Sequence, residues 1–232
     1  MKTPITTDVQ RLAVESFRTF LASEVTPVAR LFEGRSIPAQ KMRELTQGIA
    51  EFGLPGASIM QSLGGMGLSA VTEALLFEEL RSASRVVAES VLGNLLVASA
   101  LAGLPSSQQS MRERFLPDLL AGRGHGGFCL EQAEGVSAWP TDDGWVINGN
   151  QQRFCNRQCV DVLVTPLPAW EGVCCFVVVE GGQDDGGARN DPSYPAQVTF
   201  SDVRLPADLS DAQTRWIDQV LTRLRGDGCN AQ

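Results

Sequence analysis

Residues 126 to 161 read GGFCLEQAEGVSAWPTDDGWVINGNQQRFCNRQCVD, and at this segment the chain changes from a helical pattern to a strand pattern. Short apolar runs are separated here by two turn signals, Asp143-Gly144 and Asn148-Gly149-Asn150. This arrangement is typical of hairpins. We therefore expect a meander of short antiparallel strands to begin at this point.

The sequence before this segment predicts five helices. Apolar residues recur at helical spacing in residues 8–32, 42–52, 70–80, 86–101 and 108–120. Pro27 should end or kink the first of them. The stretch 86–101 is apolar on nearly every side, so we expect it at the centre of an all-helical bundle.

A glycine-rich loop, Leu63-Gly64-Gly65-Met66-Gly67-Leu68-Ser69, connects two of these helices. Such a loop invites a phosphate-binding interpretation, but no strand precedes it and it lacks the GK[ST] ending of a P-loop. We expect instead a tight helix-to-helix connection that ends at Ser69 as the N-cap of the next helix.

The sequence after Asp161 predicts further strands and one helix. The run 173–179 reads as a strand buried on both faces, 198–205 as a last strand, and 210–225 as a helix opened by a capping box. The predicted fold class is α+β. We expect an N-terminal all-helical bundle (1–122), a small antiparallel β-barrel or sandwich domain (123–206), and a residual C-terminal helix and tail (207–232).

Composition narrows the classes of partner. The formal net charge of −8 argues against nucleic acid and against an anionic membrane. The N-terminus lacks the apolar core of a secretory signal and no uninterrupted apolar run would span a bilayer, so we expect a cytoplasmic protein. The six cysteines are expected to be reduced, and with a single histidine, His125, we expect no metal site.

Several stretches, taken together and in order, resemble the front two-thirds of an acyl-CoA dehydrogenase. They cover roughly residues 45–206 and carry the family patterns "GL…GGxGLS", "LPxLAxG", "WVINGxK" and "VxFxDVRVP". The matching segments are FGL at 52–54, GGMGLS at 64–69, FLPDLLAG at 115–122, WVINGN at 145–150 and VTFSDVRLP at 198–206. Each match alone is weak, but their common order makes a different fold unexpected.

The resemblance implies a cofactor, a substrate and a set of contact residues. In that family FAD is held by the middle β-domain and a C-terminal helical domain, and acyl-CoA enters beside the N-terminal helices. A carboxylate removes the α-proton while hydride leaves the β-carbon for the flavin. By this resemblance the flavin-binding positions are Leu130, Glu131, Ser137, Phe154, Cys155 and Asn156, and the substrate-binding positions are Phe128 and Ser137.

The sequence also departs from the family pattern. Glu131 stands where the family has a flavin-bonding threonine. The second flavin motif is one residue short, so that either Phe154 or Arg153 takes its aromatic place. The resemblance puts the catalytic glutamate in the C-terminal helical bundle, so no residue here is assigned as the base. Glu78, Glu79 and Glu131 are better explained as surface helix positions or strand edges.

These observations lead to three functional hypotheses. The first is a truncated subunit of a heteromeric FAD-dependent acyl-CoA or acyl-thioester dehydrogenase, completed by a full-length subunit or by self-association. The second is a non-catalytic, degenerate homologue that binds an acyl thioester or another protein. The third, ranked last, is a flavoenzyme that is active on its own.

Overall fold

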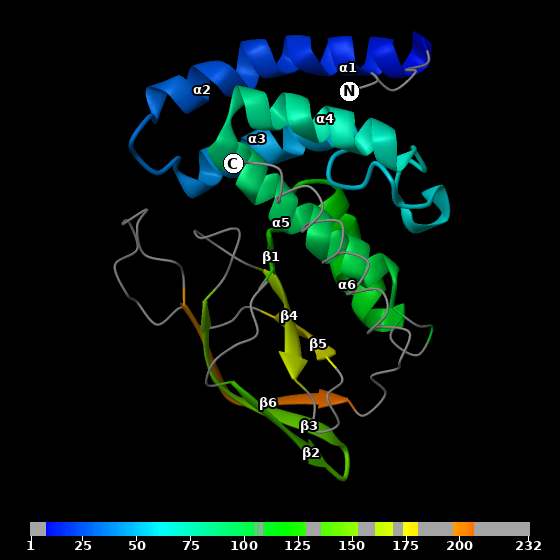
Figure 1. Cartoon of the computed structure of the whole chain (residues 1–232), viewed down its shortest axis with the longest axis vertical. Helices are drawn as coiled ribbons and strands as arrows, with labels where there is room; N and C mark the ends of the chain where they lie inside the picture. Colours follow the sequence, from blue (N-terminus) through cyan, green and yellow to red (C-terminus); the bar gives the residue numbers. More distant parts are fainter. Residues whose placement is uncertain are drawn as a thin grey trace, which may run out of the picture.

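The computed structural model describes residues 8–104, 106, 109–128, 136–152, 161–168, 174–180 and 197–206. A helical part lies against one β-sheet, and a second sheet lies on the far side of the first (Figure 1). The prediction of an α+β fold, with helices first and strands after them, is confirmed. The predicted helix at 210–225 lies outside the described residues.

The helical part contains six α-helices and two short segments of other helical type within the described residues. They are α1 (Asp8–Phe20), η1 (Leu21–Val25), α2 (Thr26–Leu31), α3 (Ala39–Ala50), η2 (Gln61–Leu63), α4 (Ala70–Ala83), α5 (Arg85–Ala102) and α6 (Gln109–Leu120). The five predicted helical stretches are all present, and the first is divided into three segments.

Pro27 explains the division of the first stretch. Proline has no backbone N–H, and its ring would clash with the carbonyl group four residues before it. The chain meets this constraint by widening into the π-helical turn η1 directly before α2, which carries Pro27 in its first turn. The predicted interruption is therefore confirmed, and it takes the form of a wider helical turn.

An aromatic contact holds the first helix to the end of α3. The Phe17 and Phe20 rings lie 5.2 Å and 5.0 Å from the Phe52 ring, measured between centroids. These rings belong to an apolar core that also receives residues of α4 and the first half of α5. Phe17, Phe20 and Leu21 of the predicted apolar face thus pack between helices, whereas Leu12 of the same face is 65% exposed.

Helix α5 is central, as predicted. Its first half packs in the core with α1, α3 and α4, and its second half packs with α6 and with the buried Val162 and Val164 of the first sheet. By length and composition α5 is also apolar enough to cross a membrane, and 61% of it is buried inside the protein. That degree of burial is usual for the core helix of a soluble protein.

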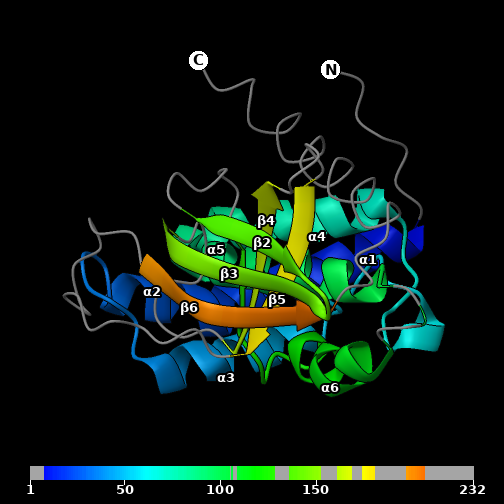
Figure 2. The ribbon, with the colours of Figure 1, turned by 90° about the horizontal axis from the view of Figure 1, so that it is seen from below.

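In the described part of the chain, six strands form two three-stranded sheets. Their bounds are β1 (Gly126–Phe128), β2 (Ser137–Thr141), β3 (Gly144–Gln152), β4 (Val162–Pro168), β5 (Cys174–Glu180) and β6 (Gln197–Pro206). The strand orders are β1-β4-β5 and β2-β3-β6. Viewed from below, the second sheet lies in front of β4 and β5, and the helices lie behind them (Figure 2).

The simple antiparallel meander is corrected in two respects. First, β1 pairs in parallel with β4, so the chain leaves the first sheet, forms the β2–β3 hairpin in the second, and returns. Second, only the turn before Gly144 reverses the chain. Strand β3 continues through Asn148-Gly149-Asn150, where a register shift against β6 between Ile147 and Gly149 replaces the predicted turn.

The register shift is held by a reciprocal pair of hydrogen bonds. The Asp202 backbone N–H donates to Asn148 Oδ1 at 2.8 Å, and Asn148 Nδ2 donates to Asp202 Oδ1 at 3.0 Å. Asp202 has a φ of +50°, a left-handed conformation that Asp adopts more readily than most residues. The residues of β3 that were expected to form a turn therefore stabilise the register shift between β3 and β6.

Candidate functional site

The two segments predicted to bind flavin adjoin neighbouring strands. Residues 130 and 131 follow β1, and residues 154–156 precede β4. Residues 154–156 lie in the segment between β3, which ends at Gln152, and β4, which begins at Val162. Strands β1 and β4 are parallel and in register from Gly126↔Val162 to Phe128↔Val164, so the end of β1 and the start of β4 lie at opposite ends of this pair.

The individual site residues are placed as follows. Phe128 is the last residue of β1 and is paired with Val164, and Ser137 is the first residue of β2 and is paired with Asn148. Both strands contact β4. The other predicted positions, Leu130, Glu131, Phe154, Cys155 and Asn156, lie outside the described residues.

Helix α5 fixes the start of β1 through one buried amide. Asn94 Nδ2 donates to the Gly124 carbonyl oxygen at 3.0 Å, and the Gly126 N–H donates to Asn94 Oδ1 at 2.7 Å. The Asn94 side chain is 1% exposed, so both bonds are shielded from water. The two bonds satisfy one buried backbone donor and one buried backbone acceptor, and together they fix the position of β1 along α5.

A close packing contact brings β1 against the same turn of α5. A Cβ placed on Gly126 would lie 2.8 Å from Val97 Cβ and 3.0 Å from the Gly93 carbonyl oxygen. Only glycine lets the strand approach this closely without displacing the helix. Gly126 is therefore required by the helix–sheet contact.

The connection from α6 to β1 is fixed by α3. Gly122 has a φ of +68°, and a Cβ there would lie 2.4 Å from the Thr46 carbonyl oxygen. The Thr46 hydroxyl donates to the Gly122 carbonyl oxygen at 3.0 Å, and Thr46 is itself buried. The glycine of the LPxLAxG-like segment thus serves both a left-handed turn and a close backbone approach.

The starts of β1 and β4 are joined by His125 and Asp161. The His125 N–H donates to Asp161 Oδ2 at 2.8 Å, and the Asp161 N–H donates back to the His125 carbonyl oxygen at 2.8 Å. These two bonds tie the start of β4 to the start of β1.

The His125 side chain lies in an unusual setting. It is 0% exposed, and neither ring nitrogen has a hydrogen-bond partner. Burial lowers the pKa of the imidazole, the nearby Asp161 charge raises that pKa, and the nearby Arg43 charge lowers it. Arg43 Nε is also buried without a partner.

The glycine-rich loop has no backbone amides to offer a phosphate. The five consecutive N–H groups of residues 64–68 donate to the carbonyl oxygens of Gln61, Met60, Gly56, Ile59 and Ala57, respectively. A phosphate loop needs these groups unpaired and pointing at the ligand. The predicted connection is confirmed, and the Ser69 side chain caps α4 by accepting from the Thr72 N–H.

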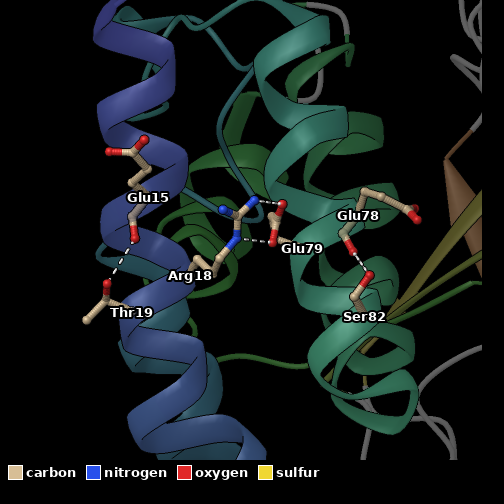
Figure 3. Close-up of polar contacts among 6 residues, drawn as sticks. All are labelled: Glu15, Arg18, Thr19, Glu78, Glu79 and Ser82. Atoms are coloured by element: carbon tan, nitrogen blue, oxygen red, sulfur yellow. Dashed lines mark hydrogen bonds and ion pairs between the residues drawn. The ribbon is translucent and has the colours of Figure 1, made fainter. Parts of the chain in front are cut away.

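The carboxylates of α4 are engaged at the surface, as expected (Figure 3). Arg18 reaches from α1 and donates to both Glu79 oxygens, at 2.5 Å and 2.8 Å. Glu78 points away from this pair and binds Arg81 on its own helix. Hydrogen bonds from Arg18 and Arg81 hold the pKa values of Glu79 and Glu78 below their ordinary range.

The sequence analysis missed Asn94 and the environment of His125. One signal was available: an amide in the middle of a helix that is apolar on nearly all sides needs a specific buried partner. His125 gave no comparable signal, because a lone histidine is common at the start of a strand. No cluster of three potential metal ligands is present in the described part of the chain.

Comparison with known proteins shows the family to which the chain belongs. The family model for the N-terminal domain of acyl-CoA dehydrogenases matches residues 7–123. The chain belongs to the acyl-CoA dehydrogenase family.

One similar protein is the mitochondrial isovaleryl-CoA dehydrogenase of Pongo abelii, which is 24% identical over 223 residues. That match covers 85% of this chain and 51% of the relative. This chain therefore spans about half the length of that curated relative.

Solved structures share the fold. Glutaryl-CoA dehydrogenase from Mycobacterium smegmatis superposes with a TM-score of 0.75 at 22% identity, over 93% of this chain and 60% of that one. An acyl-CoA dehydrogenase from Bacillus anthracis, complexed with FAD, gives a TM-score of 0.70 at 19% identity, over 89% of this chain and 38% of that one.

Proposed function

We propose that this chain contributes the helical and β parts of an FAD-dependent dehydrogenase that desaturates an acyl-CoA, or another acyl thioester, between its α and β carbons. In this proposal a partner subunit supplies the catalytic carboxylate. The observation that carries the proposal is the β1–β4 pair. It is pinned to α5, and in sequence the first segment that resembles a flavin motif follows β1 and the second precedes β4.

The side chains at the proposed flavin-binding positions match the family's pattern only in part. Leu130 and Ser137 agree with the family's pattern, either Phe154 or Arg153 takes the aromatic place, and Glu131 puts a carboxylate where the family has a hydroxyl donor. In this proposal a backbone N–H would bond the ring in place of the missing hydroxyl. FAD would supply the hydride acceptor for the β-carbon.

The chain's own contribution in this proposal is orientation. Asn94 and Gly126 set β1 on α5, and Val97 packs so closely against Gly126 that a methyl group there would not fit. A rigid strand pair would hold the reacting groups in a fixed geometry, which favours removal of a weakly acidic α-proton.

The described carboxylates nearest in sequence to the family motifs do not suit the role of the base. Glu78 and Glu79 are paired with arginines, which stabilise the carboxylate and weaken it as a proton acceptor. Asp161 is held by the His125 backbone. The proposal therefore takes the base from a partner subunit, and we propose the division of the chain at residues 122 and 206.

Visible absorption tests the proposal directly. The protein is purified alone and together with a co-expressed full-length acyl-CoA dehydrogenase from the same organism, each with FAD present. A flavin band that co-migrates with the complex and bleaches on addition of an acyl-CoA is the expected result. A band on the lone chain would instead indicate an independent flavoprotein.

Substitution of Glu131 separates the effect of its charge from that of the missing hydroxyl. Glu131→Thr should tighten FAD binding in the complex, because it removes a negative charge and restores a hydroxyl donor. Glu131→Gln, which removes only the charge, is the matched control. Equal affinity in all three proteins would place Glu131 away from the flavin and count against the proposed contact.

The second candidate is a non-catalytic homologue that binds an acyl thioester or a protein. The Glu131 replacement and the shortened second motif favour it. It predicts no flavin band on the lone chain, combined with saturable binding of an acyl-CoA by the lone chain in calorimetry. A flavin band on the lone chain would exclude this candidate.

A further inference from the structure

His125 lies where the helical part meets the first sheet. It precedes β1, it is fully buried, and it is the only histidine among the 232 residues. Both of its ring nitrogens lack a hydrogen-bond partner. Native proteins rarely leave a buried polar side chain in this state, because each unpaired group loses its bonds to water without replacement.

The charges around His125 come from two elements. Arg43 reaches it from α3, and Asp161 approaches it from the start of β4. Helix α5 presents the uncharged Asn94 to the same connection. At the end of α6, Asp118 and Arg123 neutralise each other in an ion pair of 2.7 Å whose side chains are more than half exposed.

The surroundings of His125 would therefore stabilise its protonated form only weakly. The imidazolium would have no acceptor for its two N–H groups and would face the positive charge of Arg43. Asp161 is the one opposing charge, and one of its oxygens already accepts the His125 backbone N–H. Protonation thus favours any state in which His125 reaches water.

We propose that His125 is a pH-sensitive latch between the helical part and the β1–β4 pair: the neutral side chain keeps the joint closed, and its protonation in mild acid opens it. The joint consists of the bonds from Asn94 to Gly126 and from Thr46 to Gly122. This inference is independent of the proposed function, since it requires neither flavin nor substrate.

The direction of the pH effect follows from linkage. Burial lowers the pKa of folded His125 from its ordinary value of 6.5, which applies in the open state. The open state therefore binds more protons. Stability from the closed joint is complete above pH 6.5 and is lost as the pH falls below that value toward the folded pKa. The opening equilibrium can rise by up to about 30-fold between pH 7.5 and pH 5.0.

The first test is a nuclear magnetic resonance titration of the wild-type chain. A single histidine gives a single set of imidazole signals, so the midpoint belongs to His125 without assignment by mutation. We expect a midpoint below pH 6.5. A midpoint at or above 6.5 would overturn the latch, because folded His125 would then accept its proton without opposing the closed state.

The second test compares opening in variants by amide hydrogen exchange at Gly126 and Val162, with Leu21 in the helical core as an internal reference. The ratio of opening at pH 5.0 to that at pH 7.5 should be large in the wild type and near one in His125→Gln. Equal ratios in the two proteins would refute the proposal.

The Arg43→Gln variant provides a third test, which does not require the His125→Gln variant to fold. Removing the adjacent positive charge should move the His125 titration midpoint upward and reduce the pH dependence of opening. Arg35→Gln, at an exposed arginine outside this joint, should leave both unchanged and is the control. An Arg43→Gln midpoint equal to the wild-type value would contradict the proposed arrangement of charges.

Discussion

Asn94 of α5 and Gly126 of β1 are joined by a hydrogen bond of 2.7 Å between a side-chain oxygen and a backbone N–H, both buried. The same side chain binds the Gly124 carbonyl oxygen. One amide thus satisfies two backbone groups that flank His125. This small contact determines how the helical part meets the first sheet.

Replacement of Asn94 by leucine should destabilise the protein severely. The leucine side chain has a similar branched shape but is larger, and it cannot form the two buried hydrogen bonds that Asn94 makes to the Gly126 N–H and the Gly124 carbonyl oxygen, so we expect a cost of about 2–5 kcal/mol. Urea unfolding followed by circular dichroism measures the loss. Gln109→Leu removes an exposed amide from α6 and should cost far less. Comparable losses in the two variants would mean that the buried bonds contribute little.

Two nearby glycines should respond oppositely to alanine. Gly126→Ala places a methyl group within 3 Å of Val97 and should cost about 1–3 kcal/mol through overpacking. The nearest atoms to a Cβ on Gly124 lie at 3.5 Å, an ordinary contact, so Gly124→Ala should be tolerated. Thermal unfolding of both variants measures the difference, and a stable Gly126→Ala variant would show that the strand can move off the helix.

The glycine-rich loop should not bind phosphate. The N–H groups of residues 64–68 are bonded to carbonyl oxygens of the preceding segment 56–61, so addition of inorganic phosphate should leave their amide chemical shifts unchanged. Sodium chloride at equal ionic strength is the control. A saturable shift with phosphate alone would require the loop to open and would contradict the hydrogen-bond pattern seen here.

The Arg18–Glu79 pair should stabilise the α1–α4 contact only slightly, since Arg18 is mostly exposed. Because the Arg18 hydrogen bond lowers the pKa of folded Glu79, the contribution is present above the ordinary carboxyl value of 4.5 and is lost as pH falls through the folded pKa. Glu79→Gln should therefore differ from wild type at pH 7 and low salt and converge with it at pH 3. An undiminished difference at pH 3 would point to a packing effect.

Much of the helical part could be predicted from sequence because its signals are local. The Ser69 N-cap, the interruption at Pro27 and the apolar α5 each depend on residues within a few positions of one another. The glycine-rich loop was interpreted correctly for the same reason. Periodicity and capping residues carry this information in the sequence itself.

Strand pairing and the joint could not be predicted from sequence in the same way. The parallel β1–β4 pair depends on residues 36 positions apart, and turn residues such as Asn148 equally suit a turn or a bulge. The bond from Asn94 to Gly126 and the burial of His125 arise only when helix and sheet meet. Of the predicted site, the backbone of Phe128 and Ser137 is placed, and the flavin contacts stay a prediction.

The bond between Thr46 and Gly122 joins residues separated by 76 positions. During synthesis at about 5–20 residues per second, roughly 4–15 s pass between the addition of Thr46 and that of Gly122. During this interval the Thr46 hydroxyl has the Arg43 carbonyl oxygen of its own helix as an acceptor. The bond that fixes the connection to β1 thus becomes possible only after the whole helical part has been synthesised.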